Sequence, residues 1–295
     1  MSDTERLINH QDGLDIVTAL QAIAGNAEDI GTLSNLSTDA KTSLVAAINE
    51  IAYNVIADGA GAHNAIYRGK NLGTSVTAAQ WAAIAAGTFH DLFIGDYWVI
   101  NSVTWRIAAF NYWLNYGDTS CTTNHVVIVP DSNLTSAKMN DTNITTGAYI
   151  GSDFYTGNND NTGFATVKTA VNNAFGSAHI LNHREHLQNA VTNGYESGGS
   201  WYDSTVELMT ERMVYGCDIF HNTMKGTNIP NAYSIDYGQL PLFRFDRSRI
   251  CNRGHWWLRD VVSSAYFACV RDHGICGYYS AGISIGIRPA FGIRA

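Results

Sequence analysis

The C-terminal segment constrains the fold of this chain more than any other part of it. Two blocks, WWLRD at residues 256–260 and GIRPAF at residues 286–291, bracket a stretch whose apolar residues follow neither the helical nor the strand period. The stretch mixes Tyr, Arg and Ile with Ser and Gly, a combination typical of binding surfaces because it joins large contact area to adaptable hydrogen bonding. We therefore predict a rigid frame that displays an irregular surface.

The residue types of the two blocks suggest how the frame is held. Trp256 and Trp257 are expected to fill the core beneath the displayed surface. Arg259 with Asp260, or Arg288 with a nearby carboxylate, is expected to fasten the ends through charged hydrogen bonds. Proline fixes φ where the last strand begins. The predicted frame residues are Trp256, Trp257, Arg259, Asp260, Arg288 and Pro289.

The two blocks resemble the ends of the C-terminal variable region in proteins that phage and bacterial diversity-generating retroelements diversify. In that family a WWLRD-type block opens the region, a G-[VI]-R-P-A-F block closes it, and the region lies on a C-type-lectin-like fold. Positions randomised there derive from AAC codons and never become Lys, Glu, Gln, Met or Trp. None of these five residue types occurs in residues 261–287 of this chain.

The resemblance implies a variable region of about residues 250–291 and a set of ligand-binding positions within it. An ordinary terminal pair of hairpins with exposed aromatic residues is the alternative interpretation. The positions that the resemblance implies are Tyr266, Cys269, Arg271, Asp272, His273, Ile275, Tyr278, Tyr279, Ile283 and Ile285.

The N-terminal part predicts two helices. Apolar residues recur at alternating spacings of four and three from Ile16 to Ile30, and a similar pattern runs from Leu44 to Val55. This is the a/d seam of helices that pack lengthwise, as in a coiled coil. The segment GTLSNLSTDAKTSLVAAINEI also resembles a stretch of phage tail and head fibre proteins, where it belongs to oligomeric, usually trimeric, stalks. An intramolecular helical hairpin is the alternative.

These features divide the chain into a helical stalk for attachment and oligomerisation (residues 1–60) and a ligand-binding domain (residues 61–295). The second part predicts an α+β fold, and several of its blocks resemble the body of the same C-type-lectin-like family. Helices are expected from Thr77 to Gly87 and at residues 166–174 and 184–192. Strands are expected at residues 96–100, 104–109, 125–129 and 242–245, with a hairpin turn at Asn101–Ser102 and a long loop over residues 131–163.

His183, Glu185 and His186 form the tightest ionisable group in the chain. The zinc pattern HExxH places its ligands four residues apart, whereas these histidines are three apart and no third ligand is identifiable. We interpret the group as the solvated face of a helix, with a metal site as the alternative. The chain has no nucleophile elbow, P-loop or dinucleotide fingerprint, and its five cysteines include no CxxC pair.

The net charge and the absence of several sequence motifs argue against some classes of partner. The formal net charge is −8 with no cluster of Lys and Arg, so a nucleic-acid partner is not expected. No signal-peptide pattern or membrane-length apolar run occurs, so we expect synthesis in the host cytoplasm and no membrane insertion. The E-P-N and Q-P-D motifs of calcium-dependent lectins are absent as well. Catalytic residues, metals and cofactors are therefore not expected.

Together these features predict a receptor-binding protein of a phage virion rather than an enzyme. In this interpretation the chain is a fibre or tail-tip adhesin, and its stalk forms a homotrimer and contacts other virion proteins. The lectin-like domain then displays its diversified surface to a glycan or protein receptor on the bacterial host. The alternative is a structural decoration protein of the virion that has no external ligand.

Overall fold

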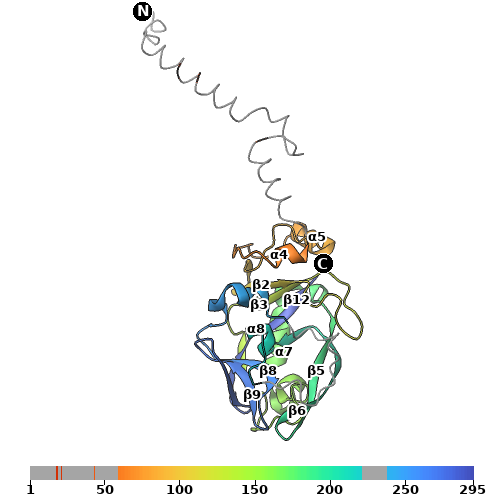
Figure 1. The fold of residues 1–295 in the computed structure, drawn as a ribbon, viewed down its shortest axis with the longest axis vertical. Coiled ribbons are helices and arrows are strands. Elements are labelled where there is room, and N and C mark those ends of the chain that lie inside the picture. The colour runs from red at the N-terminus through yellow and green to blue at the C-terminus, as the bar shows by residue number, and fades with distance from the viewer. Residues whose placement is uncertain (1–17, 19–20, 22–42, 44–58, 221–237) are drawn as a thin grey trace, which may run out of the picture. The chain divides into compact units, whose positions relative to one another are not determined.

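The protein is described by a computed structural model that covers residues 59–220 and 238–295, with residues 18, 21 and 43. The chain divides into two compact units, Met1–Ala57 and Asp58–Ala295. The predicted N-terminal stalk helices lie outside the described residues. The second unit is an α+β domain that consists mostly of β-sheet with a few short helices, as predicted at that level (Figure 1).

The first sheet has the strand order β1-β2-β3-β12-β7, and each strand is antiparallel to its neighbours in this order. Asn101 and Ser102 have φ values of 52° and 63° between β1 and β2, as a two-residue hairpin turn of type I′ requires. The last strand, β12, lies between β3 and β7, so the C-terminal segment is an interior strand of the sheet. The strands are β1 (Tyr97–Ile100), β2 (Val103–Phe110), β3 (Val126–Pro130), β7 (Val206–Leu208) and β12 (Pro289–Ile293).

The second sheet has the order β10-β9-β8-β11-β4 and contains most of the predicted variable region. Only Arg288 separates β11 from β12, so the chain crosses from the second sheet to the first at this residue. The strands are β4 (Thr135–Ala137), β8 (Trp256–Val261), β9 (Tyr266–Val270), β10 (Cys276–Ser280) and β11 (Ile285–Ile287).

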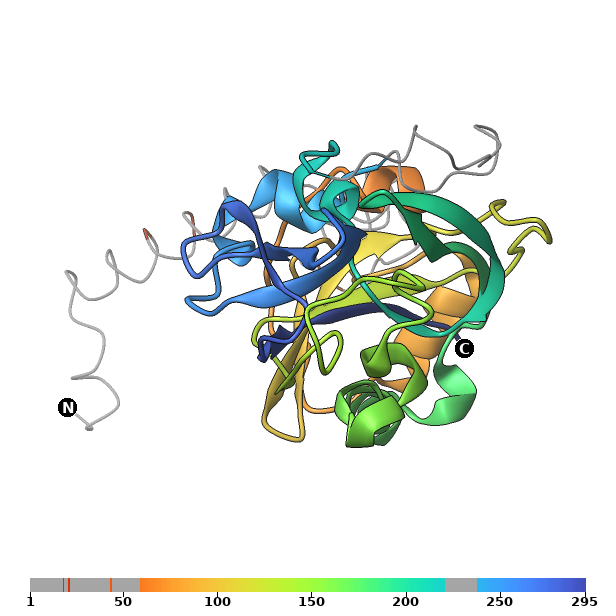
Figure 2. The same ribbon diagram turned by 90° about the horizontal axis from the view of Figure 1, so that it is seen from below.

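A separate two-stranded hairpin consists of β5 (His183–Thr192) and β6 (Tyr195–Ser204). Figure 2 shows it as a long curved ribbon in blue-green, to one side of the blue strands of the second sheet. The prediction of a helix at residues 184–192 was wrong. Burial alternates from His183 to Gln188, which is the strand period, but two of the three inward residues, His183 and Glu185, are polar, so hydrophobicity did not reveal the strand.

Local signals located other helices correctly. Thr77 and Gln80 form a capping box at the start of α5 (Ala78–Ala86), and Gly87 ends it with φ at 72°. The helix predicted at residues 166–174 is α7 (Gly163–Phe175). The strand predicted at residues 242–245 was wrong, because proline occupies the first position of a short helix there, α9 (Pro241–Phe245).

The long loop expected at residues 131–163 instead contains β4, one short helix and a 3-10 turn. The other described helical elements are α4 (Ala60–His63), α6 (Asp153–Thr156), α8 (Glu211–Tyr215), η2 (Asn158–Asp160), η3 (Ser177–His179) and η6 (Arg247–Arg249). Within the described part of the chain, no helix has the length and apolar character needed to cross a membrane.

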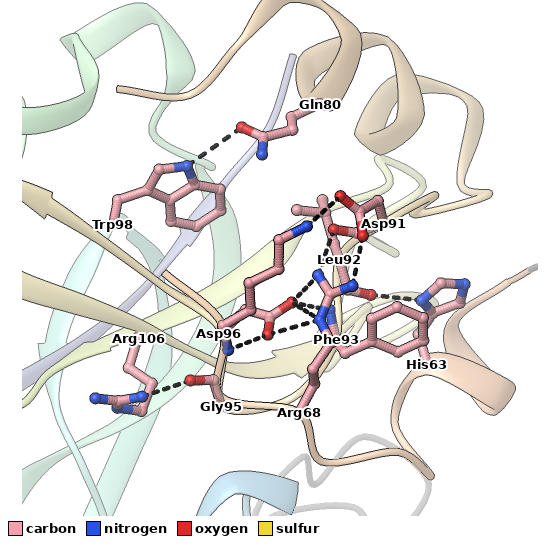
Figure 3. Close-up of polar contacts among 11 residues, drawn as sticks. His63, Arg68, Gln80, Asp91, Leu92, Phe93, Gly95, Asp96, Trp98 and Arg106 are labelled. Carbon is pink, nitrogen blue, oxygen red and sulfur yellow. Dashed lines mark hydrogen bonds and ion pairs between the residues drawn. The ribbon is translucent and has the colours of Figure 1, made fainter. Parts of the chain in front are cut away.

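A polar network around Asp96 attaches the segment after α4 to the first sheet (Figure 3). Asp96 is fully buried and accepts hydrogen bonds from the Arg68 side chain and from the backbone amides of Lys70 and Phe93. Four donors compensate the cost of burying this carboxylate, and the residue precedes β1 directly. The network positions the edge of the first sheet.

Candidate binding surface

The predicted frame is buried throughout. Trp256, Trp257 and Arg288 are fully buried, and Arg259 and Asp260 are only 6% and 4% exposed. The indole of Trp257 donates a hydrogen bond to the carbonyl oxygen of Ala137 at 2.9 Å, which ties β8 to β4 across the intervening strand β11. The two tryptophans therefore belong to the core, as the sequence predicted.

The ionic contacts of the frame differ from the expected ones, because the partners come from other elements. Arg259 donates to Glu185 of β5 at 2.7 Å, and Asp260 accepts from the backbone amide of Glu211, the first residue of α8, at 2.7 Å. A carboxylate at a helix start satisfies a free amide and interacts favourably with the helix dipole. The frame strand β8 is thus tied to a hairpin and a helix at once.

Arg288 holds the crossing between the two sheets through carbonyl oxygens instead of the expected carboxylate. It donates to the carbonyl groups of Pro130 and Arg249, each at 2.7 Å. Its guanidinium lies 5.1 Å from the ring centroid of Trp256 and 5.5 Å from that of Phe243. Burial lowers the pKa of Arg288 to about 10. The charge is therefore balanced by dipoles and aromatic faces.

The structure places the ten predicted surface positions in different environments. Cys269 is fully buried and Ile285 is 9% exposed, so the expectation of surface positions was wrong for these two. Cys269 lies in the middle of β9 opposite Trp257, and Ile285 pairs with Ala137 of β4. The exposed positions are Tyr266, Asp272, His273, Ile275, Tyr278 and Ile283, and Arg271 and Tyr279 are half-buried.

The register of β9 and β10 assigns the tyrosines to two faces of the second sheet. Tyr278 lies opposite Ala268, and its ring is 5.3 Å from the ring of Tyr266 on the same face. Phe220 also contacts Tyr278, with ring centroids 5.3 Å apart, a neighbour that no sequence signal indicated. Consecutive strand residues point to opposite faces, so the next residue, Tyr279, lies on the other one.

Tyr279 belongs to a second, smaller group beside the β9–β10 turn. Its ring is 5.2 Å from that of His255, and the guanidinium of Arg271 lies 5.5 Å from the ring centroid. In the turn itself, His273 lies 2.6 Å from Asp272, and this contact lowers the pKa of the Asp272 carboxyl. Exposed Ile275 follows Gly274, whose φ of 85° suits glycine.

The interpretation of residues 183–186 as a solvated helix face was wrong, because His183 and Glu185 are buried in β5. Glu185 lies 3.3 Å from His183 and 3.2 Å from the hydroxyl of Ser204. That hydroxyl is also 2.8 Å from Glu207. These residues form a buried polar network beside the frame.

The pKa values of the two carboxyl groups in this network are shifted in opposite directions. Burial acts to raise the pKa of Glu185, but Arg259 and His183 lower it to about 2. Burial, and then the charge of Glu185, raise the pKa of Glu207 to about 7. Tyr149 donates to Glu207 at 2.8 Å. Within the described ranges, no group of three or more His, Cys, Asp or Glu side chains could hold a metal ion.

The cysteines of the described ranges are all free thiols. The Cys276 thiol donates to a carboxylate oxygen of Glu211 at 3.3 Å. Burial, and then the charge of Glu211, raise the pKa of Cys276, and burial raises that of Cys269 to about 12. Because the thiolate is the nucleophile, both thiols are suppressed as reactive groups.

Comparison of the chain with protein-family models, with curated proteins and with solved structures found no match.

Proposed function

We propose that this protein is a phage fibre or tail-tip adhesin whose lectin-like domain displays a diversified surface to a receptor on the bacterial host. One observation carries the proposal: buried frame residues lie on both sides of a segment with exposed apolar side chains. Ten large apolar residues are exposed within the described residues, and four of them lie in the predicted variable region. These four are Tyr266, Ile275, Tyr278 and Ile283, with exposed fractions of 37%, 55%, 42% and 47%.

The contacts of the frame support this role. Arg259, Asp260 and Arg288 are hydrogen-bonded to elements outside the variable region, so the strands keep their positions when intervening side chains change. In scaffolds that carry recognition loops, rigid elements likewise hold the structure while the loop sequences vary. Clustered tyrosines supply contact area at a low cost in conformational entropy. In this proposal the N-terminal segment forms a trimeric stalk on the virion, which multiplies weak single-site affinity.

Cell binding tests the proposal. The fluorescently labelled full-length protein is incubated with a panel of diverse bacterial isolates, and bound fluorescence is measured by flow cytometry. Replacing Tyr266 and Tyr278 together by serine is expected to abolish binding and leave the melting temperature near that of the wild type. Tyr116→Ser is the matched control, because Tyr116 is also 37% exposed but lies outside the variable region. Equal loss in the control, or no binding to any isolate, contradicts the proposal.

Comparative sequencing separates the adhesin from a decoration protein. Substitutions among related phage isolates are expected to concentrate between residues 261 and 285 if the surface is diversified for receptor binding. A uniform spread along the domain favours decoration. A near-copy of this segment in neighbouring DNA, with adenines at the codons of the exposed positions, is the further expected outcome.

A further inference from the structure

The strand β10 (Cys276–Ser280) is an edge of the second sheet and lies within the predicted variable region. Its inner neighbour, β9, pairs with it along its whole length without a register shift. Within the described ranges, no strand pairs with its other side. An unpaired edge presents a row of main-chain donors and acceptors to which another strand can add.

The register determines which main-chain groups of β10 point outward. The amide of Arg271 donates to the carbonyl oxygen of Ile275, and the amide of Ala281 donates to that of Ala265, each at 2.9 Å. Antiparallel strands alternate hydrogen-bonded and non-hydrogen-bonded pairs, so every second residue from Ile275 to Ala281 directs its main-chain groups towards β9. The residues whose main-chain groups point away from β9 are Cys276, Tyr278 and Ser280.

The outward groups of β10 are available to a partner. Within the described part of the chain, the amides of these three residues make no hydrogen bond to another segment. Of their carbonyl groups only that of Ser280 accepts one, from the amide of Ile283 at 3.0 Å. The edge strand β1 of the first sheet differs, because the amide of Tyr97 donates to the carbonyl oxygen of Lys70 at 2.9 Å. An earlier segment therefore covers that edge, whereas the edge of β10 remains open.

Aromatic side chains flank the open edge on both faces of the sheet. Tyr278 lies beside Tyr266 on one face and is 42% exposed. Tyr279 lies on the other face, where Arg271 and His255 contact its ring. Successive side chains of an added strand point to alternate faces, so they would contact these two groups in turn.

The composition of β10 favours strand addition, and the charge of the chain favours a different molecule as the partner. The strand contains no proline and no charged residue, and its pairing with β9 has no β-bulge, although these features commonly protect edge strands. The formal net charge of −8 opposes the close approach of a second copy. Alternating main-chain donors and acceptors match the main chain of an extended peptide.

We propose that β10 binds an extended segment of a partner protein, which adds to the second sheet as a further strand. The main chain supplies the same hydrogen bonds whatever side chains the strand carries. Affinity is thereby kept when side chains change, while Tyr278 and its neighbours select among segments. Identification of the partner as the host receptor rests on the proposed function, whereas strand addition itself does not.

Ser280→Pro and Ser280→Ala form a matched pair for the test. Proline removes the outward amide hydrogen and leaves the β9 ladder intact, and edge strands tolerate it. Alanine removes only the hydroxyl group. A library of random linear heptapeptides is selected against the full-length protein, and the enriched peptides are measured by titration calorimetry. They are expected to bind wild type and Ser280→Ala equally, and Ser280→Pro about tenfold more weakly, the order of one lost hydrogen bond.

N-methylated peptides test the same contact without a change in the protein. Methylation of the alternate amides that face β10 is expected to abolish binding, and methylation of the other amides is expected to preserve it. This series decides alone if Ser280→Pro melts far below Ser280→Ala. The proposal is overturned if no peptide is enriched, if folded Ser280→Pro binds as well as wild type, or if every N-methyl group is tolerated.

Two further measurements separate the alternatives. Sedimentation of the full-length protein identifies a second copy as the occupant, and overturns the proposal, if Ser280→Pro dissociates a larger assembly. Flow cytometry with bacterial isolates is expected to show weaker binding of Ser280→Pro than of Ser280→Ala. Peptide binding that depends on the edge, without binding to any isolate, supports strand addition and contradicts the adhesin proposal alone.

Discussion

Replacing Glu207 by glutamine tests whether the buried polar network holds a proton near neutral pH. Glu185 and Glu207 are 1% and 5% exposed, and both lie within hydrogen-bond distance of the Ser204 hydroxyl. That hydroxyl has one hydrogen and can donate to only one carboxylate. Arg259 and His183 stabilise charge on Glu185. A protonated Glu207 can then donate to Ser204, which donates onward to Glu185.

The direction and size of the pH effect follow from the pKa of Glu207, about 7 in the folded protein against an ordinary 4.5. Because the pKa is higher in the folded protein, the protonated Glu207 side chain stabilises the fold. This stabilisation is complete below about pH 4.5 and is lost as the pH rises through about 7. Each pKa unit corresponds to about 1.4 kcal/mol, so the wild type loses about 3 kcal/mol in this window. Tyr149 and Tyr155 also face the network, but burial raises the pKa of both hydroxyl groups, so they remain neutral across this range.

Glutamine reproduces the protonated side chain. Its amide group can donate to Ser204 and its oxygen can accept from Tyr149, so Glu207→Gln keeps the contacts and removes the titration. Scanning calorimetry is expected to give similar melting temperatures for variant and wild type at about pH 5. At about pH 8 the variant is expected to melt roughly 6–12 °C higher. An equal pH dependence in both proteins refutes the assignment of the proton to Glu207.

Glu185→Gln is the matched control on the same network. It leaves the buried guanidinium of Arg259 without its 2.7 Å carboxylate partner. Loss of one member of a buried ion pair costs about 3–5 kcal/mol. The control is therefore expected to be destabilised at both pH values, the opposite of Glu207→Gln. Stabilisation of both variants by similar amounts would indicate that the network is not organised around Arg259.

Three further outcomes are expected. Trp257→Ala is expected to lower the free energy of unfolding by about 3–5 kcal/mol in a urea titration, because the indole is fully buried and hydrogen-bonded. Gly286→Ala is expected to lower the free energy of unfolding by about 1–3 kcal/mol in the same titration, since the new methyl group would lie 2.7 Å from the backbone oxygen of His255, the residue before β8. With a thiol reagent at about pH 8, Cys217 is expected to react fast and Cys269 and Cys276 slowly, because Cys217 is exposed whereas Cys269 is buried and Cys276 is half-buried. Equal rates would contradict this difference in exposure.

Elements whose signals lie in neighbouring residues were predictable from the sequence. The side chains of Thr77 and Gln80 cap α5, and the turn at Asn101 and Ser102 takes positive φ values that the closely spaced strands require. The buried tryptophans of the frame were predictable as well, because large aromatic residues in a C-terminal block have few environments other than the core.

Only the tertiary structure decided which side chains share a surface. Tyr278 and Tyr279 are adjacent in the sequence, but the strand pleat separates them onto two faces, and Cys269 is buried by its position opposite Trp257. The strand β5 was hidden for a related reason. Its inward Glu185 is stabilised by Arg259, 74 residues away, so polar residues occupy positions where a local pattern predicts apolar ones. Charge pairing between distant segments has no local signature, because its energy exists only once the chain has folded.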